Sequence, residues 1–335
     1  MKDIYLTFDY ELFLGAETGT VNNCLHIPMI QLMKVLNKYD IKCTLFVDCA
    51  YIYRLSQIKN VSQSLNADFQ TIIADLKEYI ANGHEVQFHY HPQWLFSNFS
   101  NGRWSLDFEH YGMGDLEENF LIQTFKESKQ LLEDLLNVKM NAFRAGGFTL
   151  QDCPYVSDLF IDNGISIDSS VVINGKYKSS SINYDFRSAP HKSMWLFYDS
   201  VVREDKAGSF VELPINTRLV TGLNYYFQKV KNVCSFRNKI LQWGDGKSVA
   251  YSESKSNLLI DKLKRIISSS VAKYASLDVL AATGLEHDYK KQEGDVMVLI
   301  SHPKYLTNVS IDLLDKFIAN HIKSDNFKTV SRCIK

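Results

Sequence analysis

The sequence lacks several features that would assign it to a specialised class of protein. Its 335 residues carry a formal net charge of -1 and no block of basic residues, which argues against a nucleic-acid partner or an anionic membrane surface. No run approaches the roughly 18 consecutive apolar residues that a membrane-spanning helix requires, so we expect no membrane insertion. The first residues, MKDIYLTFDYELF, contain acidic side chains and no small-residue cleavage site, and are therefore not predicted to be a signal peptide.

The cysteines show no C-x-x-C spacing, which argues against a zinc-ribbon or thioredoxin-like motif. In a chain of this size without an export signal, scattered cysteines are typical of reduced, mostly buried thiols. We therefore expect a cytoplasmic protein, and the sequence leaves its oligomeric state open. The six cysteines are Cys24, Cys43, Cys49, Cys153, Cys234 and Cys333.

Short apolar runs with strand character alternate along the chain with longer runs of helical period. Hydrophobic residues make up 45% of the chain, which is enough for a sizeable core. This alternation predicts parallel βαβ units and a closed or nearly closed α/β barrel, in a single domain over residues 1–335. Strands are predicted at residues 4–12, 42–48, 84–90, 139–145, 165–171, 209–215, 295–301 and 327–331, and helices at 27–40, 68–83, 115–136, 154–164 and 310–322.

Two segments interrupt the alternation. Residues 94–114 are aromatic and contain glycine, and we predict a long loop there, which in a compact domain is usually functional. Residues from about 217 to 294 are rich in lysine and have helical period. We interpret this second segment as a helical insertion packed on the barrel.

Polar side chains recur where the predicted strands end, and the active sites of parallel barrels lie at those ends. The first strand ends with Asp9 and Glu11, and the third with His89 and His91. Two histidines at period 2 point to the same face of a strand, and histidine is the commonest metal-ligating side chain. Each residue alone has a structural explanation, but their recurrence at strand ends favours a site. Later strands end with Arg144, Asp168 and His302.

Two carboxylates and two histidines suit a divalent metal with an open coordination position, as in hydrolytic zinc sites. Such a metal makes its bound water a nucleophile near neutral pH, and a carboxylate that does not bind the metal accepts the proton. In this arrangement Arg144 would orient that carboxylate, and His302 would donate a proton to a leaving amine.

The ordered motifs LTFDYE, GHEVQFHYH, FRAGG, IDSSV, VELPI and LISHP resemble those of the polysaccharide deacetylase family, the NodB-homology or carbohydrate esterase family 4 group. They run from Leu6 to Pro303, and they are most similar to a cytoplasmic branch found with surface-polysaccharide genes, where H-x-H-P-x-W and a following R-W also occur. The resemblance implies a distorted (β/α)7-type barrel. It also implies metal-dependent hydrolysis of an N- or O-acetyl group on a sugar or glycan.

The resemblance assigns roles to strand-one residues. In the family's T-F-D-D motif the first Asp is the catalytic base, which corresponds to Asp9, and the second Asp binds the metal. Tyr10 stands at that second position, so Glu11 is the expected substitute.

The resemblance likewise assigns roles on the later strands. His89 matches the first histidine of the family's second motif, but Gln93 stands at the position of the second, so His91 must replace it. We therefore expect a divalent ion, most simply zinc, held by Glu11 and these two histidines, with Asp9 at or beside them. The family's base-orienting arginine and its general-acid histidine correspond to Arg144 and His302.

Two other functions stay open. One is a glycoside hydrolase on a similar barrel, with Asp9 or Glu11 in a retaining pair of carboxylates. The other is a carbohydrate-binding protein in which the departures at Tyr10 and Gln93 have abolished catalysis. Acetate release would indicate the deacetylase, and a new reducing end would indicate the glycoside hydrolase. Metal binding without turnover would indicate the inactive carbohydrate-binding protein.

The segment HPQWLFSNFSNGRW is rich in aromatic and amide side chains. We predict that Gln93, Trp94 and Trp104 bind substrate, because aromatic rings stack on sugar faces and amides bond hydroxyl groups. The alternative is that the two tryptophans simply fix this loop to the barrel.

Overall fold

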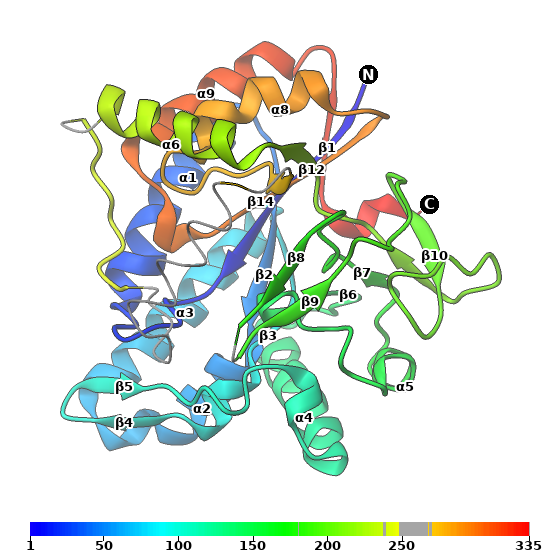
Figure 1. The fold of residues 1–335 in the computed structure, drawn as a ribbon. Coiled ribbons are helices and arrows are strands. Elements are labelled where there is room, and N and C mark those ends of the chain that lie inside the picture. Colours follow the sequence, from blue (N-terminus) through cyan, green and yellow to red (C-terminus); the bar gives the residue numbers. More distant parts are fainter. Residues whose placement is uncertain (180, 237–238, 248–266, 268–269, 335) are drawn as a thin grey trace.

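A curled, mostly parallel sheet surrounded by helices forms the centre of the molecule (Figure 1). The computed structural model describes residues 1–179, 181–236, 239–247, 267 and 270–334. Residues 248–266 of the predicted insertion therefore lie outside the described residues. The predicted α/β class and parallel barrel-type sheet are confirmed. None of the helices in the described ranges is long and apolar enough to cross a membrane.

The central sheet has nine strands in the order β10-β11-β7-β6-β3-β2-β1-β14, and β15 also pairs with β1. All of its pairings are parallel except that of β10 with β11. The strands are β1 (Asp3–Tyr10), β2 (Thr44–Asp48), β3 (Glu85–Tyr90), β6 (Ala142–Ala145), β7 (Ile167–Asp168), β10 (Trp195–Phe197), β11 (Phe210–Glu212), β14 (Val296–Ser301) and β15 (Asn326–Lys328).

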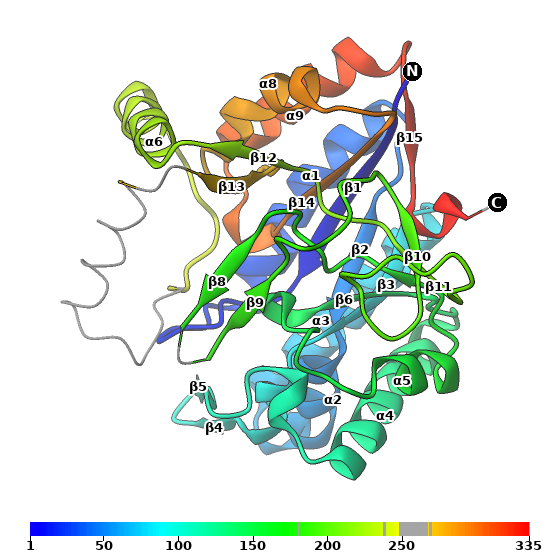
Figure 2. The same cartoon turned by 45° about the vertical axis from the view of Figure 1, so that its right-hand side comes forward.

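The helices lie around this sheet (Figures 1 and 2). They are α1 (Ile27–Lys38), α2 (Cys49–Ile58), α3 (Gln63–Ala81), α4 (Glu118–Leu136), α5 (Val156–Asp162), α6 (Gly222–Phe236), α8 (Leu285–Lys291) and α9 (Asn308–His321). Three small antiparallel pairs lie outside the central sheet: β4 (Asn98–Ser100) with β5 (Arg103–Ser105), β8 (Lys176–Lys178) with β9 (Asn183–Asp185), and β12 (Thr217–Val220) with β13 (Val271–Tyr274).

Backbone hydrogen bonds from two connecting segments nearly close the barrel between β11 and β14. The N–H of Asn216, four residues after β11, donates to the carbonyl of Val298 at 3.1 Å. On the same strand, the N–H of Ile300 donates to the carbonyl of Ala275, also at 3.1 Å. The closure is therefore irregular, which accounts for the distorted form of the barrel.

Strands β2, β3 and β6 are buried along almost their whole length, as expected when helices cover a parallel sheet. Every residue of β2 is buried, and its last residue, Asp48, stands in register with His89 of β3. His89 in turn stands in register with Arg144 of β6. The pairing thus places three polar side chains in one row at the carboxyl ends of three adjacent strands.

Side-chain caps explain where two helices beside the site begin. The carboxylate of Asp48 accepts a hydrogen bond from the backbone N–H of Tyr51 at 3.3 Å, which caps α2 as β2 ends. Thr307 caps α9 in the same way, accepting from the N–H of Ser310 at 3.1 Å. Each cap satisfies one of the backbone donors that a helix start leaves free.

The two irregular segments differ in part from the predictions. The stretch 94–114 holds the β4–β5 hairpin, whose turn residues Asn101 and Gly102 have φ of 51° and 74°. The predicted long loop therefore contains a short hairpin that was not predicted, and Asn-Gly favours its tight turn. The described part of 217–294 contains the helices α6 and α8, and also the paired strands β12 and β13, which were not predicted.

Candidate metal centre and active site

The end of β1 supplies two buried carboxylates. Asp9 and Glu11 are only 3% and 4% exposed. They share one face of the chain because successive side chains of a strand alternate, which directs the intervening Tyr10 to the other side.

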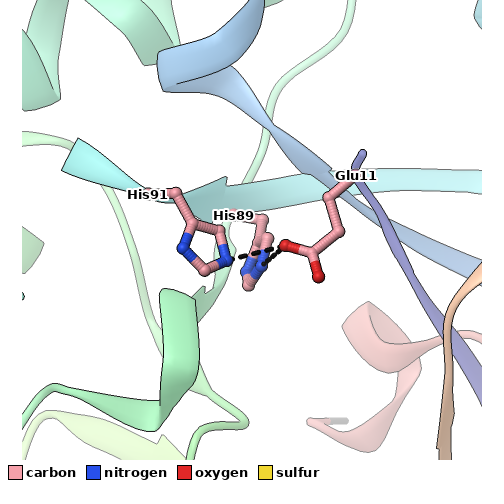
Figure 3. Close-up of side chains that lie close together, drawn as sticks. All are labelled: Glu11, His89 and His91. Carbon is pink, nitrogen blue, oxygen red and sulfur yellow. Dashed lines mark hydrogen bonds and ion pairs between the residues drawn. The ribbon is translucent and has the colours of Figure 1, made fainter. Parts of the chain in front are cut away.

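Glu11 meets two histidines from the end of β3 (Figure 3). Its Oε2 lies 2.7 Å from Nε2 of His91 and 3.2 Å from Nε2 of His89. The ligating atoms of these three residues all lie within 4.8 Å of one another, and all three residues are buried. We call Glu11, His89 and His91 the three-residue cluster. The structure thus brings together the three residues that we predicted as metal ligands.

The donor atoms of the cluster fit a divalent cation. The Nδ1 of His89 lies 2.7 Å from the carbonyl oxygen of Arg144, so this nitrogen is the donor and Nε2 points to the centre of the cluster, where a metal ion would replace the proton on it. Such an outer hydrogen bond commonly fixes the orientation of a metal-binding histidine. Nδ1 of His91 has no partner among the described residues. Two imidazole nitrogens and one carboxylate oxygen form a three-ligand set of the kind used in catalytic zinc sites.

Buried charges shift the pKa values of this cluster. Burial acts to raise the pKa of Glu11, but Lys304 and the two histidines together hold it well below its usual range. Burial acts to lower the pKa of His89, whereas Asp9 and Glu11 raise it to about 9. Glu11 is therefore a carboxylate at neutral pH, the form in which it binds a metal.

Arg144, from β6, holds Asp9 beside the cluster. Its Nη1 donates to Oδ1 of Asp9 at 2.7 Å and to Oγ1 of Thr7 at 2.9 Å. Its Nε and Nη2 donate to the carbonyl and hydroxyl oxygens of Ser169 at 2.8 and 2.9 Å. Arg144 is 0% exposed, so the guanidinium is fixed and orients the carboxylate. Among the described residues, the group whose ligating atoms all lie within 4.8 Å of one another does not include Asp9.

His302 faces these carboxylates from the end of β14. Its Nε2 lies 3.7 Å from Oδ2 of Asp9 and 3.6 Å from Oε1 of Glu11. Its Nδ1 lies 2.8 Å from Oδ2 of Asp278, whose other oxygen accepts from the hydroxyl of Ser301 and the N–H of His302. Burial opposes protonation, but Asp278 and the two strand-one carboxylates raise the pKa of His302. Asp278 therefore fixes the ring with Nε2 facing the cluster.

Sequence reasoning missed several residues of this site. Lys304 donates to Oε1 of Glu11 at 2.7 Å, and Asp278 orients His302. Asp48 is 1% exposed, its Oδ2 has no partner within the described ranges, and burial raises its pKa. Only Asp48 carried a usable signal, since it ends a predicted strand as Asp9 does. Lys304 and Asp278 lie in connections, where residue spacing carries no information about contacts.

Asp168 lies at the end of β7 and is not part of the three-residue cluster. Its two oxygens accept from the hydroxyl and the N–H of Ser170 at 2.8 and 3.0 Å. Glu212 stands beside it in register on β11. Both acids are 0% exposed, and burial raises the pKa of each. The pair therefore belongs to the packing between the strands.

Two of the three predicted substrate-binding residues are packed inside the molecule, and the third, Trp104, is half-buried. Gln93 and Trp94 are both 0% exposed. The Trp94 ring lies 4.5 Å from the ring of Tyr51 and 5.2 Å from that of Trp104. The Trp104 ring in turn forms an edge-to-face pair with the ring of Phe99 on β4. This packing agrees with the alternative that the tryptophans fix the segment to the barrel, and it leaves the Trp94 ring no free face for a sugar.

We expect Trp94→Ala to destabilise the protein by about 3–5 kcal/mol, the usual effect of removing a large buried aromatic side chain. Urea denaturation measures this loss. The matched control is Trp195→Ala, which removes another buried tryptophan, on β10, whose Nε1 donates to the carbonyl of Val201. Both variants should lose stability and keep the KM for a sugar substrate. A raised KM with normal stability in Trp94→Ala alone would instead make Trp94 a substrate contact.

A separate cavity of about 570 Å³ lies at the other end of β14, where Val296 and Met297 form part of its wall. Arg218, Lys273 and Asp288 also line it. The carboxylate of Asp288 accepts from both cations, at 3.0 and 2.9 Å. The three-residue cluster is not part of its lining. We take the cluster as the candidate active site because the polar groups converge there.

No model of a protein family matches the chain, and no curated protein of similar sequence was found. Three solved structures, each aligned over 99% of this chain, show the range of proteins with a similar fold. A protein from Mycobacterium smegmatis described as a polysaccharide deacetylase is 12% identical, aligned over 89% of its own chain with a TM-score of 0.49. A 4-alpha-glucanotransferase from Thermococcus litoralis is 12% identical over 38% of its chain, with a TM-score of 0.49. A carbohydrate esterase family 4 pseudoenzyme from Bacillus anthracis is 11% identical over 64% of its chain, with a TM-score of 0.40. At these values the likeness carries no argument about activity.

Proposed function

We propose that this protein is a metal-dependent hydrolase that removes an acetyl group from an N- or O-acetylated sugar. The observation that carries the proposal is the convergence of the three-residue cluster, the Asp9–Arg144 pair and the His302–Asp278 pair at the carboxyl ends of β1, β3, β6 and β14. The sugar substrate and a role in surface-polysaccharide metabolism rest on the resemblance of the ordered motifs to polysaccharide deacetylases.

A divalent cation, most simply zinc, would be held by Glu11, His89 and His91, and would supply Lewis-acid activation of water and of the acyl carbonyl. Asp9 is the base that accepts the proton of the attacking water, because Arg144 fixes one of its oxygens and leaves the other facing His302. His302 donates a proton to the departing amine through Nε2. Asp278 holds the ring through Nδ1 during that transfer.

The direct test compares two products on acetylated sugars. Protein freed of metal and then reloaded with Zn²⁺ should release acetate from acetylated chitooligosaccharides or acetylated xylan without forming new reducing ends. New reducing ends would identify a glycoside hydrolase. Bound metal without acetate release from any acetylated sugar would identify a carbohydrate-binding protein that has lost catalysis.

We expect His91→Ala to lose most of its zinc, because it removes one of three protein ligands. Elemental analysis after gel filtration measures the loss. The matched control is His84→Ala, at the residue directly before β3. His84 is also buried, accepts from the N–H of Cys43 at 3.2 Å, and has a pKa lowered by burial to about 4. Unchanged zinc content in His91→Ala would contradict this ligand assignment.

A further inference from the structure

A buried lysine contacts the carboxylate of the three-residue cluster. Lys304 lies in a short helical turn (Pro303–Tyr305) directly after β14 and is 4% exposed. Its ammonium group donates to Oε1 of Glu11 and to the carbonyl oxygen of Leu12, both at 2.7 Å. The rings of Phe13 and Tyr305 lie 5.5 and 5.6 Å from Nζ. These contacts hold the ammonium in one place.

The two oxygens of Glu11 therefore have different neighbours. Oε1 faces Lys304, and Oε2 faces the imidazoles of His89 and His91. A cation held by the cluster meets Oε2, whereas Oε1 is already occupied by the ammonium. Glu11 can thus offer one oxygen, as in a compact tetrahedral site.

Each of the two strand-one carboxylates is balanced by one buried cation. Lys304 neutralises Glu11, and Arg144 neutralises Asp9. A carboxylate paired with an ammonium attracts a divalent cation less strongly than a free carboxylate, because the ammonium repels the cation from a few ångströms away.

We propose that Lys304 is a positioning residue that restricts Glu11 to a single ligating oxygen and weakens the binding of a divalent cation by the cluster. This inference rests on the proposed function, because it takes the cluster to be a metal site. The ammonium leaves more of the positive charge of the cation available to an acyl oxygen, which is where a hydrolase needs it.

The test measures zinc affinity in Lys304→Met and Lys304→Gln by competition with a chromophoric chelator at neutral pH. Both variants remove the charge, and glutamine keeps a hydrogen-bond donor for Glu11. We expect both to bind Zn²⁺ on the order of tenfold more tightly than the unchanged protein. Equal or weaker binding would overturn the inference. Lys129→Met is the matched control, because Lys129 is also buried and pairs with Glu133 at 2.6 Å on α4; its zinc affinity should not change.

A second measurement does not depend on how the variants fold. A crystal structure of the unchanged protein with Zn²⁺ should show one oxygen of Glu11 at about 2.0–2.2 Å from the ion, with the other oxygen still bound to Lys304. Two ligating oxygens would overturn the inference.

The His91→Ala variant distinguishes a failure of this inference from a failure of the proposed function. If His91→Ala leaves zinc affinity unchanged, the cluster is not the metal site and both fail. If it abolishes binding while the Lys304 variants bind no more tightly, only the role of Lys304 fails.

Discussion

Asp9→Asn should lower turnover on an acetylated sugar by about 10²–10⁴-fold, the usual effect of removing a general base. Asparagine has nearly the same shape as aspartate and still accepts the hydrogen bond from Nη1 of Arg144, but its amide cannot take a proton from water. Zinc content should stay unchanged, because Asp9 lies outside the three-residue cluster. Initial rates of acetate release and elemental analysis on the same preparation test both expectations.

Stability must be measured alongside activity in this variant. Arg144 would lose its buried ionic partner, and breaking a buried pair is destabilising. It would keep its hydrogen bonds to Thr7 and to both oxygens of Ser169, which limits the loss. Asp168→Asn is the matched control, because it changes a buried aspartate at another strand end and should lose stability but keep turnover. If Asp9→Asn loses zinc together with activity, Asp9 is a ligand and Glu11 becomes the candidate base.

The sequence predicted the parts of the site that depend on strand periodicity. Asp9 with Glu11, and His89 with His91, are pairs at period 2 on two strands whose ends lie close together in the sheet. For parallel strands the carboxyl ends lie at one edge of the sheet, so the strand assignment placed these residues at the same edge. It did not decide which of them meet, since Asp168 also ends a strand and is not part of the three-residue cluster. The same reasoning identified Arg144, because it also ends a strand.

The contacts that the sequence did not predict depend on tertiary packing. Asp278 lies within the segment interpreted as a helical insertion. It contacts His302 three residues after Ala275, whose carbonyl accepts from Ile300 of β14. Lys304 reaches back to Glu11 from the turn after β14. Neither contact follows a period or a motif. The β4–β5 hairpin is a different case, since Asn101-Gly102 is a local hairpin signal that the sequence itself carries.

His302→Ala should lower acetate release from an N-acetyl sugar by about 10²–10⁴-fold, and should have little effect on an activated acetyl ester. Breaking an amide requires a proton for the departing amine, and an imidazole with an unperturbed pKa of about 6.5 can supply it near neutrality. An activated ester has a leaving group that departs as an anion and needs no proton. An O-acetyl sugar should lie between these two cases, because an alkoxide leaves more readily than an amine. Kinetics on the three substrates with one zinc-loaded preparation measure the difference.

The decisive quantity is the fold-loss in rate on the N-acetyl sugar divided by the fold-loss in rate on the activated ester. A structural defect would lower both rates together. His321→Ala is the matched control. His321 on α9 also lies between two carboxylates, with Nε2 at 3.2 Å from Glu286 and Nδ1 at 3.3 Å from Asp325, but it is not part of the candidate site, so its loss should leave the ratio unchanged. Equal losses on amide and ester in His302→Ala would contradict the acid role. They would show instead that His302 supports the position of Asp9 or Glu11, which its Nε2 faces at 3.7 and 3.6 Å.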